Sequence, residues 1–360
     1  MGEDSKAGVG RRYLALDAAR GFVMLVLCSE GLGLGLLDPG RYRSALLFTH
    51  VEWEGFVPWE LVMPCFMFMV GASLPLALAK RTALGQSFGT QTRHVAVRTL
   101  RMVLIGQMLW CYYAGRYSLD PIETLTQLAL SYFCCFFILQ LEQKWQVLVA
   151  LSLVAVNWLV YVVFPGAEGA FSPTSNVGLR IDQMLFGITR DSEMNWNSLN
   201  FLGSTVTVLF GAWTTQLLRS NRDPNRKLMI LLGTGSACLV LWQILLPFNP
   251  LIHKCWTTSF IACHTGFALL LTAAAYFLFD VRRYERLAFP LIVVGMNSIF
   301  IYLVNNSLKG GWLSKTVGIF TEDFEFLPWG IAPAVQGSTV CLIMWLICYW
   351  LYRRRIFFKI

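Results

Sequence analysis

A histidine and three carboxylates occur within eleven residues of this chain, immediately before a long apolar run. They are His50, Glu52, Glu54 and Glu60, and the apolar run extends to about residue 79. Imidazole titrates near neutral pH, so His50 can act as a general base or carry an acyl group transiently. Any of the three carboxylates can orient the ring and stabilise its charged form. Because a titratable cluster beside a membrane segment is costly, we predict a catalytic site at His50, with Glu60 in the catalytic set.

The elements that must hold this cluster are transmembrane helices. The chain has 360 residues, of which 56% are hydrophobic and 14% charged, whereas soluble domains carry about 25% charged residues. Apolar runs of bilayer length predict ten spans, at roughly 20–37, 58–79, 95–113, 124–140, 145–164, 199–218, 228–247, 256–279, 288–306 and 333–352. We therefore expect an all-α, polytopic transmembrane bundle that forms a single domain over residues 1–360, with residues 1–12 as a flexible tail.

The basic residues give this bundle an orientation. The net charge is +8, but Lys and Arg lie in short loops between apolar runs, so no nucleic-acid partner is needed to explain the charge. With the N-terminus inside, the cytoplasmic segments hold 21 of the 29 Lys and Arg residues. The positive-inside rule thus predicts that both termini are cytoplasmic and that the loop carrying His50 lies on the other side. We expect a multi-pass protein in a lipid bilayer.

Polar residues inside the predicted spans provide companions for His50. A rise of about 1.5 Å per residue puts Glu30 and His264 in the outer half of the membrane and Asn297 near its middle. An isolated Asn in a span usually fastens neighbouring helices, at about 0.6 kcal/mol, whereas an unpaired charge costs at least about 2.5–3.5 kcal/mol. Asn297 is placed in the catalytic set, and either Asn297 or Trp256 is the predicted oxyanion donor. The predicted substrate-binding residues are Glu30, Glu52, Trp53, Lys254, Trp256 and His264.

Four charged residues near the predicted cytoplasmic side are candidates for binding a phosphorylated cofactor. Asp17 and Arg20 are three residues apart, so they can meet on one helix face. Arg93 and Arg98 can receive phosphate groups. Each set also has a structural interpretation, as a local ion pair at a helix end or as positive-inside anchoring.

The ten cysteines do not form a metal-binding pattern. Nine of them lie inside apolar runs, and none shows a CxxC or Cys/His spacing suited to zinc. We predict reduced packing residues, with neither a metal site nor a structural disulfide.

Several segments carry motifs in a fixed order along nearly the whole chain. LDAARGF covers Leu16 to Phe22, and His50-x-x-Trp53-x-Gly55-Phe56 is followed by Glu60-Leu61 and by a Pro64-x-Phe66-x-Phe68-x-Val70-Gly71-x-Ser73 run. TLTQLALSY, LNFLGSTVTVLFG, KCWTTSF and GMNSIFIY begin at Thr124, Leu199, Lys254 and Gly295. This ordered set resembles the membrane-bound acyltransferases related to heparan-α-glucosaminide N-acetyltransferase, particularly their bacterial relatives.

The resemblance implies a reaction. It suggests that, in a bacterial inner membrane, acetyl-CoA on the cytoplasmic side donates an acetyl group to an amine on the other side, with His50 as the catalytic residue. Glu60 stands where the family usually has Asp, and Gly31 stands where the human relative has Asn. The acceptor is therefore predicted only as an amino sugar or glycan precursor.

Two other classes of function remain open. A permease for a small polar solute would use the same outer polar pocket, although no internal repeat of the kind common in transporters is visible. A structural membrane subunit would use its polar residues only to fasten helices. Small residues at Gly31, Gly33 and Gly35 would allow the close helix contact of a homodimer.

Overall fold

The fold is known from a computed structural model of the whole chain, which describes residues 13–29, 31, 33–37, 43–188, 196–307, 312–321 and 332–358. The regular elements within these residues are helices, and Gly166 and Gly169 form an isolated bridge. The contacts divide the chain into two compact units. Unit 1 contains residues 52–55 and 67–273, and unit 2 contains residues 13–51, 56–66 and 274–358.

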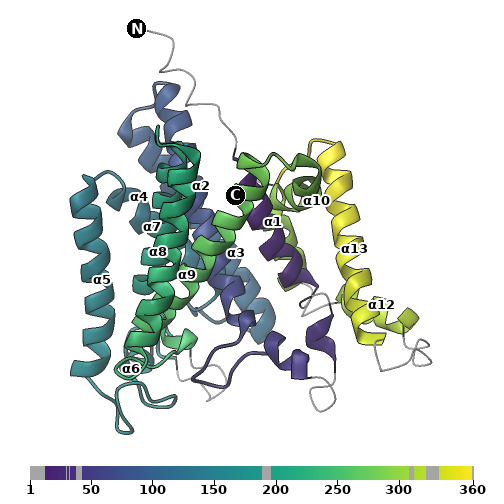
Figure 1. Cartoon of the computed structure of the whole chain (residues 1–360). Coiled ribbons are helices and arrows are strands. Elements are labelled where there is room, and N and C mark those ends of the chain that lie inside the picture. The colour runs from purple at the N-terminus through teal and green to yellow at the C-terminus, as the bar shows by residue number, and fades with distance from the viewer. Residues whose placement is uncertain are drawn as a thin grey trace. The chain divides into compact units, whose positions relative to one another are not determined.

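The helices of unit 1 are most of α2 (Val62–Ala83), then α3 (Phe88–Ala114), α4 (Thr124–Ile138), α5 (Gln143–Val163), α6 (Val177–Phe186), α7 (Asn200–Arg219), α8 (Pro224–Leu245), η5 (His253–Cys255) and α9 (Thr258–Ala275). Those of unit 2 are α1 (Leu14–Cys28), η1 (Leu34–Leu36), η2 (Arg43–Phe48), η3 (Pro58–Leu61), η6 (Tyr276–Val281), α10 (Glu285–Gly295), α11 (Ser298–Ser307), α12 (Trp312–Thr321) and α13 (Ala332–Arg353). Figure 1 labels most of these elements along the chain.

The all-helical, multi-pass character predicted from composition is confirmed. Among the described residues, six helices are long and apolar enough to cross a membrane, and the pair α10 and α11, bent by 52°, makes a seventh if it counts as one span. Each of the other three predicted spans contains a helix of a different character. The helices α1 and α4 have 15 residues each, and α3 carries Arg93, Arg98 and Arg101 along its length.

The first predicted span, at 20–37, differs from the helix that forms there. Helix α1 begins at Leu14 and ends at Cys28. Beyond it, Gly31 and Gly33 have φ values of 69° and 79°, in the left-handed region. This conformation ends a right-handed helix. Two of the three glycines proposed above as helix-contact residues, Gly31 and Gly33, therefore form a turn, and Gly35 lies in the short helix η1.

The start of α1 is capped from a distant part of unit 2. Asp280 accepts hydrogen bonds from the backbone N–H groups of Leu14 and Ala15, at 3.3 and 2.9 Å. A carboxylate at this position satisfies otherwise unpaired amides and interacts favourably with the helix dipole. Tyr13, the residue before the helix, makes no side-chain cap of its own, so Asp280 replaces it.

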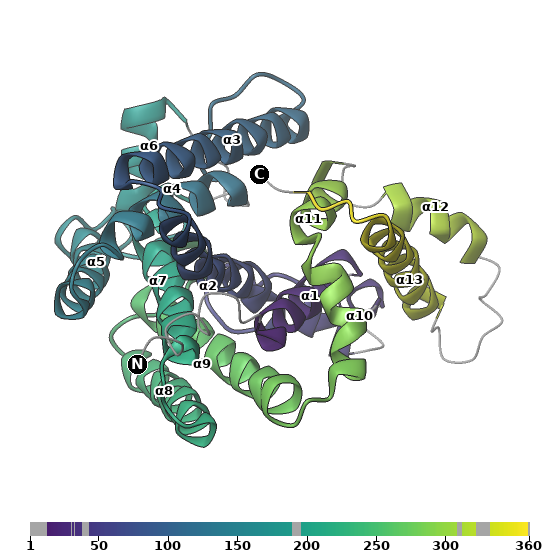
Figure 2. The same cartoon turned by 90° about the horizontal axis from the view of Figure 1, so that it is seen from above.

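Glycines allow the closest helix packing in unit 2. A methyl group added to Gly21 of α1 would lie 1.8 Å from the carbonyl oxygen of Leu291, and one added to Gly295 of α10 would lie 2.1 Å from that of Asp17. The backbones of α1 and α10 therefore touch, and Figure 2 shows the two helices side by side. Small residues at helix crossings permit this kind of packing in membranes.

Unit 1 is organised around α7. In its most apolar stretch 67% of residues are buried, against 11% for the following helix α8. Gly211 of α7 packs against the Phe68 carbonyl of α2, where an added methyl group would lie 1.9 Å away. Polar contacts reinforce the packing, because Thr215 donates to the Ala72 carbonyl at 2.6 Å and Ser204 pairs with Ser131 of α4 at 2.6 Å.

Candidate active site

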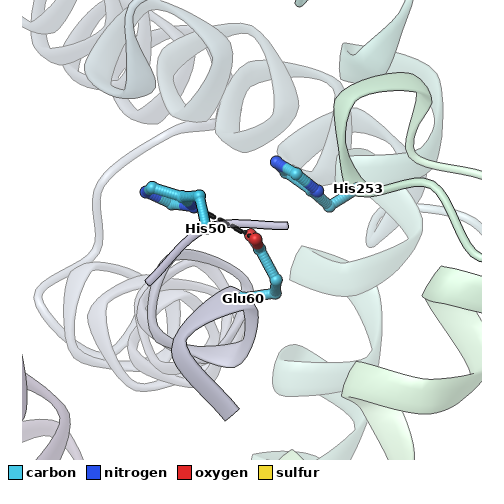
Figure 3. Close-up of side chains that lie close together, drawn as sticks. All are labelled: His50, Glu60 and His253. Atoms are coloured by element: carbon cyan, nitrogen blue, oxygen red, sulfur yellow. Dashed lines mark hydrogen bonds and ion pairs between the residues drawn. The ribbon is translucent and has the colours of Figure 1, made fainter. Parts of the chain in front are cut away.

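His50 and Glu60 form the central polar pair of unit 2. Nδ1 of His50 lies 3.1 Å from Oε1 and 3.2 Å from Oε2 of Glu60, as Figure 3 shows. The backbone N–H of Val51 also donates to Oε1, at 3.1 Å. The carboxylate side chain is only 2% exposed, whereas the imidazole is 60% exposed. The pair thus joins a buried, fixed acceptor to an accessible ring. Figure 3 also draws His253, which belongs to unit 1 and is described with it.

The contact with Glu60 favours one tautomer of His50. An ionised carboxylate can only accept hydrogen bonds, so Nδ1 carries the proton that lies against Glu60. Nε2 is then the basic nitrogen of the neutral ring. A carboxylate that orients an imidazole through one ring nitrogen is the arrangement in which the other nitrogen acts as a general base.

The local sequence explains why Glu60 is fixed. The short helix η3 begins at Pro58, and the fixed φ of proline suits the first helical position. Glu60 lies in this first turn, just before α2 starts at Val62, where the helix dipole stabilises a negative charge. Trp59 contacts the His50 ring edge-to-face at 6.4 Å, so the imidazole is held on a second side.

Residues 52–55, which follow the histidine segment, are fastened within unit 1. Lys254 donates through Nζ to the Glu52 carbonyl at 2.9 Å, and the N–H of Gly55 donates to the Leu251 carbonyl at 3.0 Å. The indole of Trp53 donates to the Phe171 carbonyl at 2.9 Å. Of the predicted substrate-binding residues, Glu52, Trp53 and Lys254 are therefore neighbours. The side chain of Lys254 and the indole N–H of Trp53 bind backbone, whereas Glu52 itself is exposed.

The turn that carries Lys254 is held by buried amides. Asn197 and Asn200 both donate to the Lys254 carbonyl, at 3.4 and 2.9 Å. Asn157 of α5 donates to the carbonyl of Trp256 at 3.0 Å. Burial raises the pKa of the neighbouring Cys255 thiol to about 12, so this cysteine stays protonated and is a poor nucleophile.

Trp256 and His264 lie in the same buried network, with no exposed surface. Trp256 has φ of 49° and ψ of 48°, a left-handed conformation that is strained for a residue with a side chain. Its indole N–H donates to Oγ1 of Thr207 at 3.3 Å, and Nε2 of His264 lies 2.7 Å from the same oxygen. Both residues were predicted to bind substrate, and in this structure they bind each other through Thr207.

The residues that link Trp256, His264 and the Lys254 turn were not among those predicted from sequence. Asn157 belongs to α5, Asn200 and Thr207 belong to α7, and Asn197 lies just before α7. His253, also buried, contacts Trp196 edge-to-face at 4.7 Å. The sequence feature that could have identified these residues is an amide or hydroxyl side chain within an apolar run. That signal points to helix fastening as often as to a site.

The third predicted catalytic residue, Asn297, binds the end of the chain. Its amide nitrogen donates to the Ile356 carbonyl at 3.3 Å, and its amide oxygen accepts from the Phe358 N–H at 3.1 Å. Within the described residues, no polar contact joins Asn297 to His50 or Glu60. Its oxyanion role stays a prediction without a geometric counterpart.

The residues predicted to bind a cofactor occur in different settings. Asp17 and Arg20 meet at 3.5 Å, as their spacing predicted. Arg98 donates to the Tyr132 hydroxyl at 3.3 Å and lies over that ring, whereas Arg93 is exposed on α3. Glu30 falls outside the described residues.

Fold and site together define an α-helical, multi-pass membrane protein with a histidine held by a buried carboxylate. Over almost its whole length, the chain is similar to heparan-alpha-glucosaminide N-acetyltransferase of Mus musculus, with 21% identity over 428 residues, 99% of this chain and 62% of the mouse protein. It is also similar to the Homo sapiens protein of the same name, with 21% identity over 417 residues, 97% of this chain and 60% of the human protein.

The chain thus spans about 60% of the length of these relatives. No protein-family model matches it. The resemblance predicted from the ordered motifs is confirmed as a distant relationship to these N-acetyltransferases.

Proposed function

We propose that this chain is a membrane acyltransferase that moves an acetyl group from acetyl-CoA to an amine or hydroxyl of an amino sugar or glycan precursor. The observation that carries the proposal is the pairing of an exposed His50 with the buried Glu60 carboxylate. The distant similarity to two N-acetyltransferases supports the same reaction class.

The pair supplies the proton transfers that this reaction needs. Nε2 of His50 takes the proton from the acceptor as its nitrogen or oxygen attacks the thioester carbonyl carbon. The Glu60 carboxylate stabilises the imidazolium that forms. When the C–S bond breaks, the imidazolium returns the proton to the departing thiolate, which leaves as the free thiol of CoA.

A covalent route uses the same atoms. Nε2 of His50 would attack the thioester carbon first, releasing the thiol and forming an acyl-imidazole. The acceptor would then displace the imidazole nitrogen. Isotope-labelled acetyl-CoA offered without acceptor distinguishes the routes, because only the covalent one labels the protein at His50.

The proposal includes an arrangement in the membrane. Ten spans, formed by the six apolar helices, the bent α10–α11 pair and the helices α1, α3 and α4, would put both termini in the cytoplasm. His50 would then lie on the opposite side, and the acetyl group would cross a bacterial inner membrane.

The test uses purified protein in vesicles loaded with glucosamine or another amine, with labelled acetyl-CoA outside. Label on the trapped acceptor is the expected result. If no amino sugar or hydroxyl acceptor is labelled, the proposal fails. Uptake of a solute without CoA would point to a permease, which the comparisons do not favour.

A further inference from the structure

Unit 1 also contains a cavity that the proposed acetyl transfer does not use. A cavity of about 480 Å³ opens between the end of α2, the start of α3, the end of α4 and the end of α7. This volume lies in the range of small-molecule sites. The lining residues are Pro75, Leu78, Ala79, Thr82, Gln86, Phe88, Gln91, Leu139, Gln140, Gln216 and Arg219. The charge distribution that predicts the membrane orientation puts all four helix ends on the cytoplasmic side.

The only charged residue of this lining is Arg219. Its guanidinium makes one long hydrogen bond, from Nη1 to the Pro75 carbonyl at 3.5 Å. No carboxylate lines the cavity, and among the described residues Arg219 forms no ion pair. Arg219 is only partly buried, so its remaining N–H groups are placed to meet an anion from solution.

The start of α3 adds to the positive character. Phe88 is both the first residue of α3 and a lining residue, so the positive end of the helix dipole lies at the cavity. One face of the Phe88 ring stacks on Phe136 at 5.8 Å, while 54% of the residue stays exposed. The ring is therefore fixed and still offers surface to a planar group.

Four glutamines complete the lining and three of them are held in place. Gln91 donates to Oγ1 of Thr82 at 3.2 Å, Gln86 accepts from Arg81 at 3.3 Å, and Gln140 donates to the Phe136 carbonyl at 3.1 Å. Neutral amides that both donate and accept suit a ligand with polar groups besides its charge.

We infer that this cavity binds a phosphate-bearing ligand, with Arg219 as its main anionic contact. Two sources share that chemistry. One is the nucleotide end of the acyl-CoA donor, and this source rests on the function proposed above. The other is the phosphate headgroup of a membrane lipid. The assignment differs from the sequence prediction, which looked to Arg93 and Arg98.

The experiment measures binding, separately from acetyl transfer, with the full chain in nanodiscs. One arm titrates adenosine 3′,5′-bisphosphate, and the other compares retention of phosphatidylglycerol with that of phosphatidylcholine. Arg219→Gln should weaken binding in at least one arm about tenfold or more, because a charge-assisted contact is lost. Arg222→Gln is the matched control, since Arg222 is exposed just beyond α7 and does not line the cavity.

The two arms separate the two sources of phosphate. Loss in the nucleotide arm identifies the donor as the source, and loss only in the lipid arm identifies a headgroup. Unchanged binding in both arms, or no binding by the unsubstituted protein, overturns the inference. Gln216→Leu serves as a second variant if Arg219→Gln unfolds, as judged by thermal denaturation. Intact nucleotide binding without any acetyl transfer would contradict the proposed function alone.

Discussion

Nδ1 of His50 lies 3.1 Å from the buried Oε1 of Glu60, while the imidazole itself is exposed. If Nε2 moves the proton during acyl transfer, His50→Ala should lower kcat by about 10²–10⁴-fold, the usual contribution of general base catalysis. Glu60→Gln should cost less, because an amide oxygen still accepts from Nδ1–H but does not stabilise the imidazolium. Initial rates with labelled acetyl-CoA measure both effects.

The control for this pair is His94→Ala, since His94 is an exposed histidine of α3. It should transfer acetyl groups at the unsubstituted rate. A His50→Ala protein that folds and keeps its full rate would falsify the role of His50.

The hydroxyl of Thr207 joins Trp256 to His264, and its removal should destabilise unit 1. Thr207→Val leaves the indole N–H and an imidazole nitrogen without this partner in a fully buried position. Each stranded group costs about 1–3 kcal/mol, so the thermal midpoint should fall clearly.

Thr214→Val is the comparison, on the same helix and also buried. Thr214 donates only to the Phe210 carbonyl within α7, so a small shift is expected. Equal midpoints for the two variants would show that the Thr207 bridge contributes no stability.

Asn297 should hold the C-terminal segment in place and slow its cleavage by proteases. Asn297→Ala removes the two hydrogen bonds to Ile356 and Phe358, so tryptic cleavage after the exposed Arg353–Arg355 cluster should become faster. Asn225→Ala, an exposed change at the start of α8, should leave the cleavage rate unchanged. Unaltered cleavage together with a lower transfer rate would instead support the predicted catalytic role.

The contact between α1 and α10 makes a sharp prediction about two glycines. Gly21→Ala places a methyl group 1.8 Å from the Leu291 carbonyl, so the helices must separate at a cost of about 1–3 kcal/mol or more. At Gly233 of α8 no atom lies within 4 Å of an added methyl group, and alanine should be neutral or stabilising by up to about 1 kcal/mol. Thermal unfolding in one detergent compares them. Similar midpoints would mean that the α1–α10 crossing is not tight.

How much of the structure follows from sequence depends on the range of the interactions. The carboxylate beside His50 could be predicted because Glu60 follows His50 by only ten positions, just before α2 begins at Val62. The long helices could be predicted because each lies within an apolar run long enough to cross a bilayer. The end of α1 could not be placed, because Gly31 and Gly33 extend an apolar run although their backbone turns.

The partners of Trp256 could not be predicted for a different reason. Asn157 lies 99 positions away and Thr207 lies 49 positions away, and no local pattern relates them. The contacts of Asn297 could not be predicted either, because its amide binds backbone 59 and 61 positions further on. Its catalytic role stays a prediction.

The cap on α1 affects how the chain can be made. The backbone N–H of Ala15 cannot form its hydrogen bond until Asp280, 265 positions later in the chain, has been synthesised. At ribosomal speeds of about 5–20 residues per second, that interval lasts on the order of tens of seconds. During it, α1 lacks both this cap and its partner helix α10. Substitutions at Gly21, where α1 packs on α10, should therefore lower the yield of folded protein before they affect any later property.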